Sequence, residues 1–318
     1  MKSIFLDYST VSTGDLDPRS LLDAAPQLEL RDLTPQDRVA EIIDGNAIVL
    51  LNKLQLTREI IFGARDLRLI ALAATGTNNV DLQAAQERGV AVCNIRDYCS
   101  ASVAQHVLGV LLMLTHHLRD YSRDAMDGTW AQSRHFTILS HPIRELTGRT
   151  LGIVGWGVLG QAVARACEAA LGMKVLVAQR PSSPSQPGRL PLDELLARAD
   201  VVSLHCPLTD ETRNLIDAPR IACMKPDALL INTARGALVD LAALAEALRG
   251  RRLGGAAIDV LPQEPPVDGS PLFDPDIPNL IVTPHTAWAA REARQRCLDE
   301  MAANIRNWRE GGRRGRVV

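Results

Sequence analysis

A short apolar run that breaks into three glycines constrains the fold of this chain more than any other feature. The run is Leu151-Gly-Ile-Val-Gly-Trp-Gly-Val-Leu-Gly160, and an alanine-rich segment follows it at 161–170. The spacing G-x-G-x-x-G predicts a strand, a tight turn and a helix. Gly155 would make the turn, Gly157 would let the backbone approach a pyrophosphate, and Gly160 would let the helix pack closely on the strand. The free N–H groups of that helix N-terminus suit phosphates.

Length and composition set the broad class. A chain of 318 residues suits two domains, and 46% hydrophobic with 23% charged residues is an ordinary balance for a globular protein. A net charge of −2 creates no general field for nucleic acid or anionic membrane, so we expect neither partner. The N-terminus shows no basic-then-apolar leader and no apolar stretch reaches membrane-spanning length, which favours a cytoplasmic protein.

The cysteines form no pattern typical of a disulfide framework or a metal site. There are six of them, without C-x-x-C pairs, so we expect reduced, structural thiols and no metal. They are Cys93, Cys99, Cys167, Cys206, Cys223 and Cys297.

Short apolar runs alternate with helix-length segments on both sides of the glycine loop. This alternation predicts open α/β sheets with about four strands before residue 97 and about six after residue 150. The earlier strands are expected at 4–6, 47–51, 69–73 and 90–93, and the later ones at 151–154, 174–180, 201–204, 228–232, 255–260 and 280–283.

Two predicted helices indicate that the N-terminal domain is built from two separate segments of the chain. Ser102 to Leu118 is apolar nearly all round, which predicts a buried helix. A helix from about Arg291 to Arg309 is expected to return to the N-terminal domain, so that residues 1–99 and 288–318 form one domain and 100–287 the dinucleotide-binding domain. The segment 119–149 has little periodicity; an arm that packs on a second subunit and a surface excursion of one chain are both open.

Two loops of the N-terminal domain are candidate substrate contacts. Ala74-Thr-Gly-Thr-Asn-Asn-Val-Asp81 follows a strand, and exposed N–H groups in such a turn, near Thr75 and Gly76, suit a carboxylate. The plainer interpretation is a loop in which Asp81 caps the next helix. Lys53 also follows a strand, although a solvated lysine is the common case.

The end of the second strand after the glycines bears on nucleotide choice. An acidic residue there normally takes the ribose 2′-hydroxyl, and an arginine beside a neutral residue accommodates a 2′-phosphate. Here the residues are Gln179 and Arg180. The sequence therefore permits NADP(H) and does not exclude NAD(H).

Three ionisable residues follow three successive predicted strands. Arg235, Glu264 and His285 each lie in a loop at a carboxyl end, on the edge expected to bind the nucleotide. Reduction of a 2-oxo acid needs a cation for the carboxylate and carbonyl, an acid for the developing alkoxide, and a hydride donor. Arg235 can be the cation, His285 the acid, and Glu264 the carboxylate that orients His285 and favours its protonated form.

In order along the chain, these motifs resemble the D-isomer-specific 2-hydroxyacid dehydrogenases. The resemblance is carried by Gly155-x-Gly-x-x-Gly160, Asn232-Thr-Ala-Arg-Gly-x-x-Val-Asp240, Asp259-Val-x-x-x-Glu-Pro-Pro266 and Pro284-His-x-Ala-Trp288, and it covers nearly the whole chain. The loop at 74–81 and the segment Trp288-Ala-Ala-Arg-Glu-Ala-Arg294 are most similar to the bacterial glycerate dehydrogenase (hydroxypyruvate reductase) branch.

The resemblance implies two doubly wound α/β domains, with a Rossmann cofactor domain inserted into a flavodoxin-like substrate domain. It implies an NAD(P)-dependent reductase of hydroxypyruvate and glyoxylate with D-glycerate dehydrogenase activity, a homodimer built through the cofactor domains, and catalysis by Arg235, Glu264 and His285. A nucleotide-sensing corepressor on the same scaffold is the alternative. We expect further cofactor contacts from Val158, Leu159, Cys206, Pro207, Thr233, Ala234 and, at the nicotinamide carboxamide, Asp259.

Overall fold

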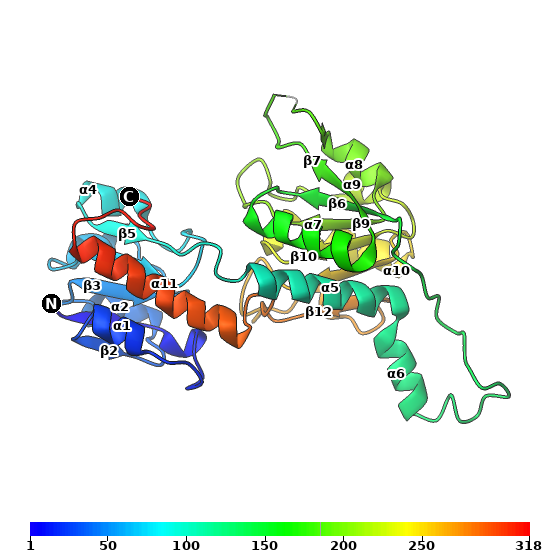
Figure 1. Ribbon diagram of the computed structural model, residues 1–318, viewed down its shortest axis with the longest axis horizontal. Coiled ribbons are helices and arrows are strands. Elements are labelled where there is room, and N and C mark those ends of the chain that lie inside the picture. Colours follow the sequence, from blue (N-terminus) through cyan, green and yellow to red (C-terminus); the bar gives the residue numbers. More distant parts are fainter. Residues whose placement is uncertain (185) are drawn as a thin grey trace. The chain divides into compact units, whose positions relative to one another are not determined.

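Two units, each built on its own parallel sheet, make up the chain. A computed structural model describes residues 1–184 and 186–318. Unit 1 comprises Met1–Cys99 and Trp288–Val318, and unit 2 comprises Ser100–Ala287. Figure 1 shows helices packed against both sheets, so the expected α/β class with two wound sheets is confirmed.

Unit 1 contains a five-stranded sheet in the order β2-β1-β3-β4-β5, with every neighbouring pair parallel. Side chains of α2, α3 and α4 share a core cluster with one face of the sheet, and α11 packs with α1 and β4. The strands are β1 (Ser3–Phe5), β2 (Leu28–Leu30), β3 (Ile48–Leu51), β4 (Leu69–Leu72) and β5 (Ala91–Cys93). The helices are α1 (Arg19–Ala24), α2 (Val39–Ile42), α3 (Arg58–Gly63), α4 (Leu82–Glu87) and α11 (Arg291–Arg309).

Unit 2 contains a seven-stranded sheet in the order β12-β11-β10-β9-β6-β7-β8, again parallel throughout. Helices α5 and α7 pack side by side, and α8, α9 and α10 share a core cluster that contains no residue of α5 or α7. The strands are β6 (Thr150–Val154), β7 (Lys174–Ala178), β8 (Arg189–Leu190), β9 (Val201–Leu204), β10 (Leu229–Asn232), β11 (Gly255–Ile258) and β12 (Leu280–Val282). The helices are α5 (Ser100–His116), α6 (Leu118–Met126), α7 (Val158–Leu171), α8 (Leu192–Arg198), α9 (Ala218–Cys223) and α10 (Leu241–Arg249).

The strand count predicted from the sequence was wrong by one in each unit. The missed strands are β2 and β8, which have three and two residues and lie at the edges of their sheets. An edge strand this short buries too little apolar surface to leave an apolar run in the sequence.

The predicted helix from Ser102 to Leu118 ends earlier than expected. His117 has a φ of +48° in the left-handed region, which breaks the chain between α5 and α6. α6 (Leu118–Met126) extends into 119–149, so the start of the segment that showed little periodicity in the sequence is helical. Among the described residues, no single helix is long and apolar enough to cross a membrane.

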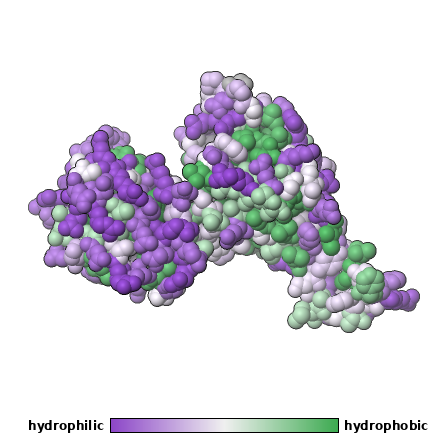
Figure 2. Space-filling view, in the orientation of Figure 1, coloured by the Kyte–Doolittle hydropathy of each residue, from purple (hydrophilic) through white to green (hydrophobic). Residues whose placement is uncertain are grey.

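The segment after α6 carries large apolar side chains on its surface. In Figure 2 apolar residues lie over the α5 and α7 face of unit 2 and continue onto this segment. The exposed fractions reach 87% at Met126, 91% at Phe136 and 82% at Leu139. Such a cluster of exposed apolar side chains is typical of an interaction surface.

Candidate active site

The glycine loop has the backbone geometry that its spacing predicts. Gly155 has a φ of +102°, and a Cβ there would lie 2.5 Å from the amide nitrogen of Cys206. A Cβ on Gly160 would lie 2.1 Å from the carbonyl oxygen of Gly155. The turn and the close packing of α7 on β6 therefore both require glycine, as the sequence predicted.

The described residues around this loop fit a dinucleotide. A Cβ on Gly157 would meet nothing within 4 Å, so the start of α7 is open to a ligand's phosphates. Thr233, after β10 on the same sheet edge, has a buried Oγ1 without a hydrogen-bond partner. A buried hydroxyl without a partner is costly, and a bound ligand would satisfy it.

The other predicted cofactor residues lie around this edge. Val158 is half exposed in the first turn of α7, beside the partly buried Leu159. Cys206 and Pro207 follow β9, and Ala234 follows β10, where its amide nitrogen donates to Asn232 Oδ1. Each of them lies in a loop or helix start that follows the carboxyl end of a strand, which is where open α/β sheets bind nucleotides.

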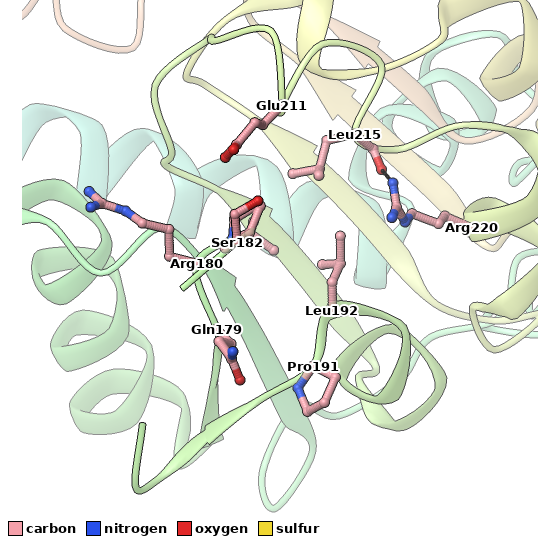
Figure 3. A pocket seen from close by; sticks show the side chains of 10 residues that line it. Gln179, Arg180, Ser182, Pro191, Leu192, Glu211, Leu215 and Arg220 are labelled. Carbon is pink, nitrogen blue, oxygen red and sulfur yellow. Dashed lines mark hydrogen bonds between the residues drawn. The ribbon is translucent and has the colours of Figure 1, made fainter. Parts of the chain in front are cut away.

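A cavity of about 270 Å³ lies beyond the end of β7. Figure 3 shows Gln179, Arg180 and Ser182 along one side and Leu192, Leu215 and Arg220 along the other. The volume is close to the lower end for ligand pockets, which suits one half of a dinucleotide.

The two arginines of this cavity differ in their partners. Arg220 pairs with Asp193 at 3.1 Å and also donates to the carbonyl of Leu215. Arg180 is exposed and forms no ion pair within the described parts of the chain. Its guanidinium is therefore available to an anion of the ligand.

His205 lies next to the glycine loop and stays neutral in the fold. Its Nε2 lies 2.8 Å from Ser203 Oγ, and burial lowers the pKa of His205 to about 4 from 6.5. A depressed histidine pKa means that the unfolded chain takes up the proton first, so stability is lost as the pH falls from about 6.5 to about 4.

Replacing His205 with glutamine is therefore expected to flatten the pH dependence of stability. Urea unfolding at pH 7 and pH 4.5 should show that the wild type loses on the order of 2 kcal/mol more than the variant. His135→Gln, at an exposed position, is the control and should behave as wild type. Equal losses in wild type and His205→Gln would contradict the assignment.

The three predicted catalytic residues follow three neighbouring strands. β10, β11 and β12 are adjacent and parallel, with Asn232 paired to Ile258 and Ile258 to Val282. Arg235, Glu264 and His285 follow the carboxyl ends of these strands in that order. The topology thus places all three loops at the edge that carries the glycine loop.

His285 and Glu264 form a direct pair. His285 Nδ1 lies 2.6 Å from Glu264 Oε2, and Glu264 Oε1 accepts the amide proton of Leu261 at 2.8 Å. A carboxylate only accepts, so Nδ1 carries the proton and Nε2 is the nitrogen available for proton exchange. The His285 side chain is 25% exposed, which leaves that nitrogen accessible.

Asp259 fixes the loop that presents His285. Its carboxylate accepts the amide protons of Thr286 at 2.8 Å and Ala287 at 3.0 Å and the hydroxyl of Thr283 at 2.5 Å. Its carbonyl accepts from the amide of His285, whose φ of +56° is unusual for a residue with a side chain. We infer that these bonds hold a strained backbone at a functional position.

His106 also approaches this loop. Its Nε2 lies 3.4 Å from Thr283 Oγ1 and 3.9 Å from Asp259 Oδ1. Its side chain is mostly buried, with 18% exposed.

Two residues that sequence reasoning missed hold the loop of Arg235. Asn232 Nδ2 donates to the carbonyl of Arg235 at 2.9 Å. Gly236 packs so closely that a Cβ would lie 2.0 Å from the carbonyl carbon of Leu261. The signal available was a polar residue ending an apolar strand and a glycine directly after the arginine.

The loop of Lys53 is held by Asp7, a third residue that the sequence did not reveal. Asp7 is buried at the end of β1, and its carboxylate accepts the amide protons of Asn52 at 2.8 Å and Lys53 at 2.7 Å. Burial raises the pKa of Asp7, and these backbone bonds oppose the shift. The Lys53 side chain itself is exposed.

Hydrogen bonds to the segment after β5 hold the turn after β4. Thr75 Oγ1 donates to the carbonyl of Ile95 at 2.9 Å, and Asn94 Nδ2 donates to the carbonyl of Thr75 at 2.7 Å. The amides of Thr75 and Gly76 donate to no acceptor in the described part of the chain. They are therefore available to a carboxylate. Asp81 caps α4 by accepting from Ala84, as the plainer interpretation held.

Asp7→Asn is expected to raise the KM for the oxo acid about tenfold while changing kcat less. The amides of Asn52 and Lys53 donate to different oxygens of Asp7, and asparagine replaces one of these with an NH2 group that cannot accept. An unsatisfied buried donor costs about 1–3 kcal/mol. Steady-state kinetics with the 2-oxo acid varied would measure this. Asp81→Asn is the matched control, because it makes the same carboxylate-to-amide change at the N-cap of α4, where the side chain accepts from Ala84 and not from the Lys53 loop. An equal KM change in both variants would contradict the positioning role.

Comparison with known proteins identifies the family. The model of the D-isomer specific 2-hydroxyacid dehydrogenase NAD binding domain matches residues 108–287. The chain is 44% identical over 272 residues to the glycerate dehydrogenase of Methylorubrum extorquens, covering 86% of this chain and 85% of that protein. It is 34% identical over 317 residues to the hydroxypyruvate reductase of Blautia hydrogenotrophica, covering 98% of each.

A solved structure agrees with these relatives. The NADPH-dependent glyoxylate/hydroxypyruvate reductase of Sinorhizobium meliloti aligns with a TM-score of 0.82 at 26% identity, over all of this chain and 97% of that one.

The fold, the glycine loop and the His285–Glu264 pair define an NAD(P)-dependent oxidoreductase. The chain belongs to the D-isomer-specific 2-hydroxyacid dehydrogenases, and its substrate is a small 2-oxo or 2-hydroxy acid. The family resemblance seen in the sequence is thereby confirmed. The corepressor alternative is not favoured.

Proposed function

We propose that this enzyme reduces hydroxypyruvate and glyoxylate to D-glycerate and glycolate, and catalyses the reverse reactions. The observation that carries the proposal is the 2.6 Å pair of His285 and Glu264 on the edge of the sheet that holds the glycine loop. Support for the substrate comes from relatives named glycerate dehydrogenase and hydroxypyruvate reductase.

His285 Nε2 gives a proton to the substrate's carbonyl oxygen as the carbonyl carbon is reduced, and takes it back in the oxidative direction. Glu264 holds the opposite ring nitrogen and stabilises the charged ring. Bound NAD(P)H would supply the hydride. Arg235 binds the substrate carboxylate and polarises its carbonyl. Taken by itself, unit 1 offers a carboxylate the amides of Thr75 and Gly76 and the positive charge of Lys53.

The substrate proposal is tested by following NADPH and NADH oxidation with hydroxypyruvate, glyoxylate, pyruvate and 2-oxoglutarate. We expect the highest kcat/KM with hydroxypyruvate or glyoxylate. Turnover confined to pyruvate or 2-oxoglutarate would refute the substrate proposal, and no turnover with any of the four would refute the reaction.

We propose that NADPH is the preferred nucleotide. Gln179 leaves no carboxylate at the end of β7 to repel a 2′-phosphate, and Arg180 beside it has a free guanidinium in the described structure. The Sinorhizobium meliloti relative is named as NADPH-dependent.

Gln179→Glu is expected to lower kcat/KM for NADPH about 10- to 100-fold, because like charges placed together cost several kcal/mol. The value for NADH should change little. Glu211→Gln removes the acidic side chain that also lines this cavity and should leave NADPH use unchanged or improved. An unchanged NADPH/NADH ratio in Gln179→Glu would show that β7 does not select the nucleotide.

We also propose that 119–149 is a dimerisation arm. Support comes from the exposed side chains of Met126, Phe136 and Leu139, which a second copy of the chain would cover. Light scattering should give the mass of a dimer, and Phe136→Ser with Leu139→Ser should shift the protein towards monomer.

A further inference from the structure

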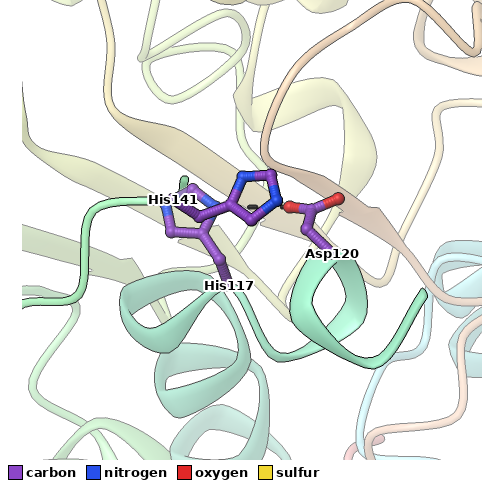
Figure 4. Close-up of side chains that lie close together, drawn as sticks. All are labelled: His117, Asp120 and His141. Atoms are coloured by element: carbon purple, nitrogen blue, oxygen red, sulfur yellow. Dashed lines mark hydrogen bonds and ion pairs between the residues drawn. The ribbon is translucent and has the colours of Figure 1, made fainter. Parts of the chain in front are cut away.

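A cluster of two histidines and a carboxylate lies at the base of the arm, outside the residues used for catalysis. One donor atom from each of His117, Asp120 and His141 lies within 4.8 Å of the other two. Figure 4 shows the two imidazoles and the carboxylate turned towards one another, with His117 and Asp120 at the start of α6 and His141 on the returning chain. We infer that this cluster is a binding site for a divalent transition-metal ion such as Zn²⁺.

The backbone places His117 for this role. His117 lies at the left-handed break between α5 and α6, with a φ of +48°. Its Nδ1 lies 3.3 Å from Asp120 Oδ2, one turn into α6. Donors 3.3 Å apart already have about the separation that two ligands take when each lies about 2.0–2.2 Å from a tetrahedral zinc ion.

His141 is brought to the same place by the end of the arm. The Tyr121 hydroxyl donates to the carbonyl of His141 at 2.6 Å, and the His141 amide lies 3.2 Å from that hydroxyl oxygen. The His141 ring stacks on the His117 ring, with centroids 5.6 Å apart and planes 19° from parallel. These backbone and stacking contacts hold the His141 ring without using its Nδ1.

A nearby carboxylate completes the donor set. Asp124 is buried, and its Oδ2 lies 2.9 Å from His141 Nε2 and 3.3 Å from Ser140 Oγ. A carboxylate that orients a ligating histidine, or that itself fills a fourth position, is a regular part of zinc and related sites. Two imidazoles with carboxylate oxygens suit Zn²⁺, Ni²⁺ and Cu²⁺ rather than Mg²⁺ or Ca²⁺.

The two histidine side chains are exposed enough for a metal ion to reach them from solvent. The side chains of His117 and His141 are 15% and 25% exposed, so solvent reaches the cluster. The remaining donors lie within 4.8 Å of one another and need to close by up to about 1.5 Å, which side-chain rotation at a partly exposed site permits. A bound ion would then link the first turn of α6 to the far end of the arm and restrain the segment between them.

The sequence predicted no metal, because its cysteines form no ligand pattern and no histidine cluster is visible along the chain. His117 and His141 are far apart in the chain, and only the path of the arm brings them together. The inference therefore departs from that expectation.

The test uses tag-free, full-length protein that has been treated with EDTA and desalted. Calorimetric titration with Zn²⁺ at pH 7.5 should show one ion per chain, and Co²⁺ should give the visible absorption of a four-coordinate site. His141→Ala and Asp120→Asn should each weaken Zn²⁺ binding more than tenfold, and Asp124→Asn should weaken it about 10- to 100-fold. His135→Ala, an exposed histidine on the same arm, should bind as the wild type does.

A second readout reports on the arm rather than on activity. Zn²⁺ should slow protease cleavage between residues 127 and 140 in wild type and in His135→Ala, but not in His141→Ala. Circular dichroism checks that each variant folds, and Asp120→Asn, which nearly preserves shape, carries the test if a histidine variant does not fold. Wild type that binds less than half an equivalent of Zn²⁺, or variants that bind it as wild type does, would overturn the inference.

Discussion

Replacing His285 with alanine is expected to lower kcat about 10²- to 10⁴-fold, the range that a positioned general acid contributes. The reason lies in the pair with Glu264: the 2.6 Å contact fixes the proton on Nδ1 and leaves Nε2 as the nitrogen that exchanges a proton with substrate. Steady-state rates with hydroxypyruvate and saturating NADPH would measure the loss, and the quenching of protein fluorescence would report NADPH binding.

The control for this prediction is Glu264→Gln. Glutamine can still accept from Nδ1 but carries no charge, so the kcat loss should be smaller than in His285→Ala and the pH profile of kcat should move. NADPH binding should be unchanged in both variants. A His285→Ala enzyme whose kcat stays within tenfold of wild type would show that another group supplies the proton.

Arg235→Ala is expected to lower kcat/KM for the oxo acid by about 10²-fold or more. Truncating one partner of a hydrogen-bonded charge pair costs about 2–5 kcal/mol, because the substrate carboxylate loses its cation. The KM for the oxo acid should rise strongly, and the KM for NADPH should not. Kinetics with each substrate varied in turn would separate the two effects.

Arg235→Lys and Arg180→Ala are the comparisons for that experiment. Lysine keeps the positive charge but not the two parallel N–H donors, so it should restore only part of the activity. Arg180→Ala removes an arginine of the nucleotide cavity and should change the KM for NADPH instead. If Arg235→Ala and Arg180→Ala changed the same constant, Arg235 would not be the substrate's cation.

Much of the fold could be predicted because the signals are local. The buried strands β3 and β4 are wholly aliphatic, and β9 and β10 are aliphatic apart from Ser203 and Asn232, a pattern typical of a parallel sheet covered on both faces. The turn at Gly155 and the packing at Gly160 follow from the spacing of three glycines. Elements with weak local signals were missed: β2 and β8 are too short, and α6 has a predominantly polar surface.

The residues of the candidate site could be identified for a related reason. In a parallel sheet the carboxyl ends of neighbouring strands meet at one edge, so a loop position after each strand is also a position in space. Arg235, Glu264 and His285 were found in this way. The supporting roles were not. Asp259 was expected only as a cofactor contact, and Asn232 and Gly236 were not expected at the site, because all three act through backbone contacts whose partners the sequence does not reveal.

The sequence by itself determined the order of the longer strands and helices, the cofactor loop, the family and the residues proposed to react. Only the tertiary structure decided how those residues are held. It shows that Asp7 accepts hydrogen bonds from the Lys53 loop and that Asp259 accepts them from the loop of His285. It also shows that the rings of His117 and His141 stack at the base of the arm. The physical reason is the sequence separation of the interacting residues. Turns and periodic runs depend on near neighbours in the chain, whereas these contacts join distant segments and form only when both segments are packed in place.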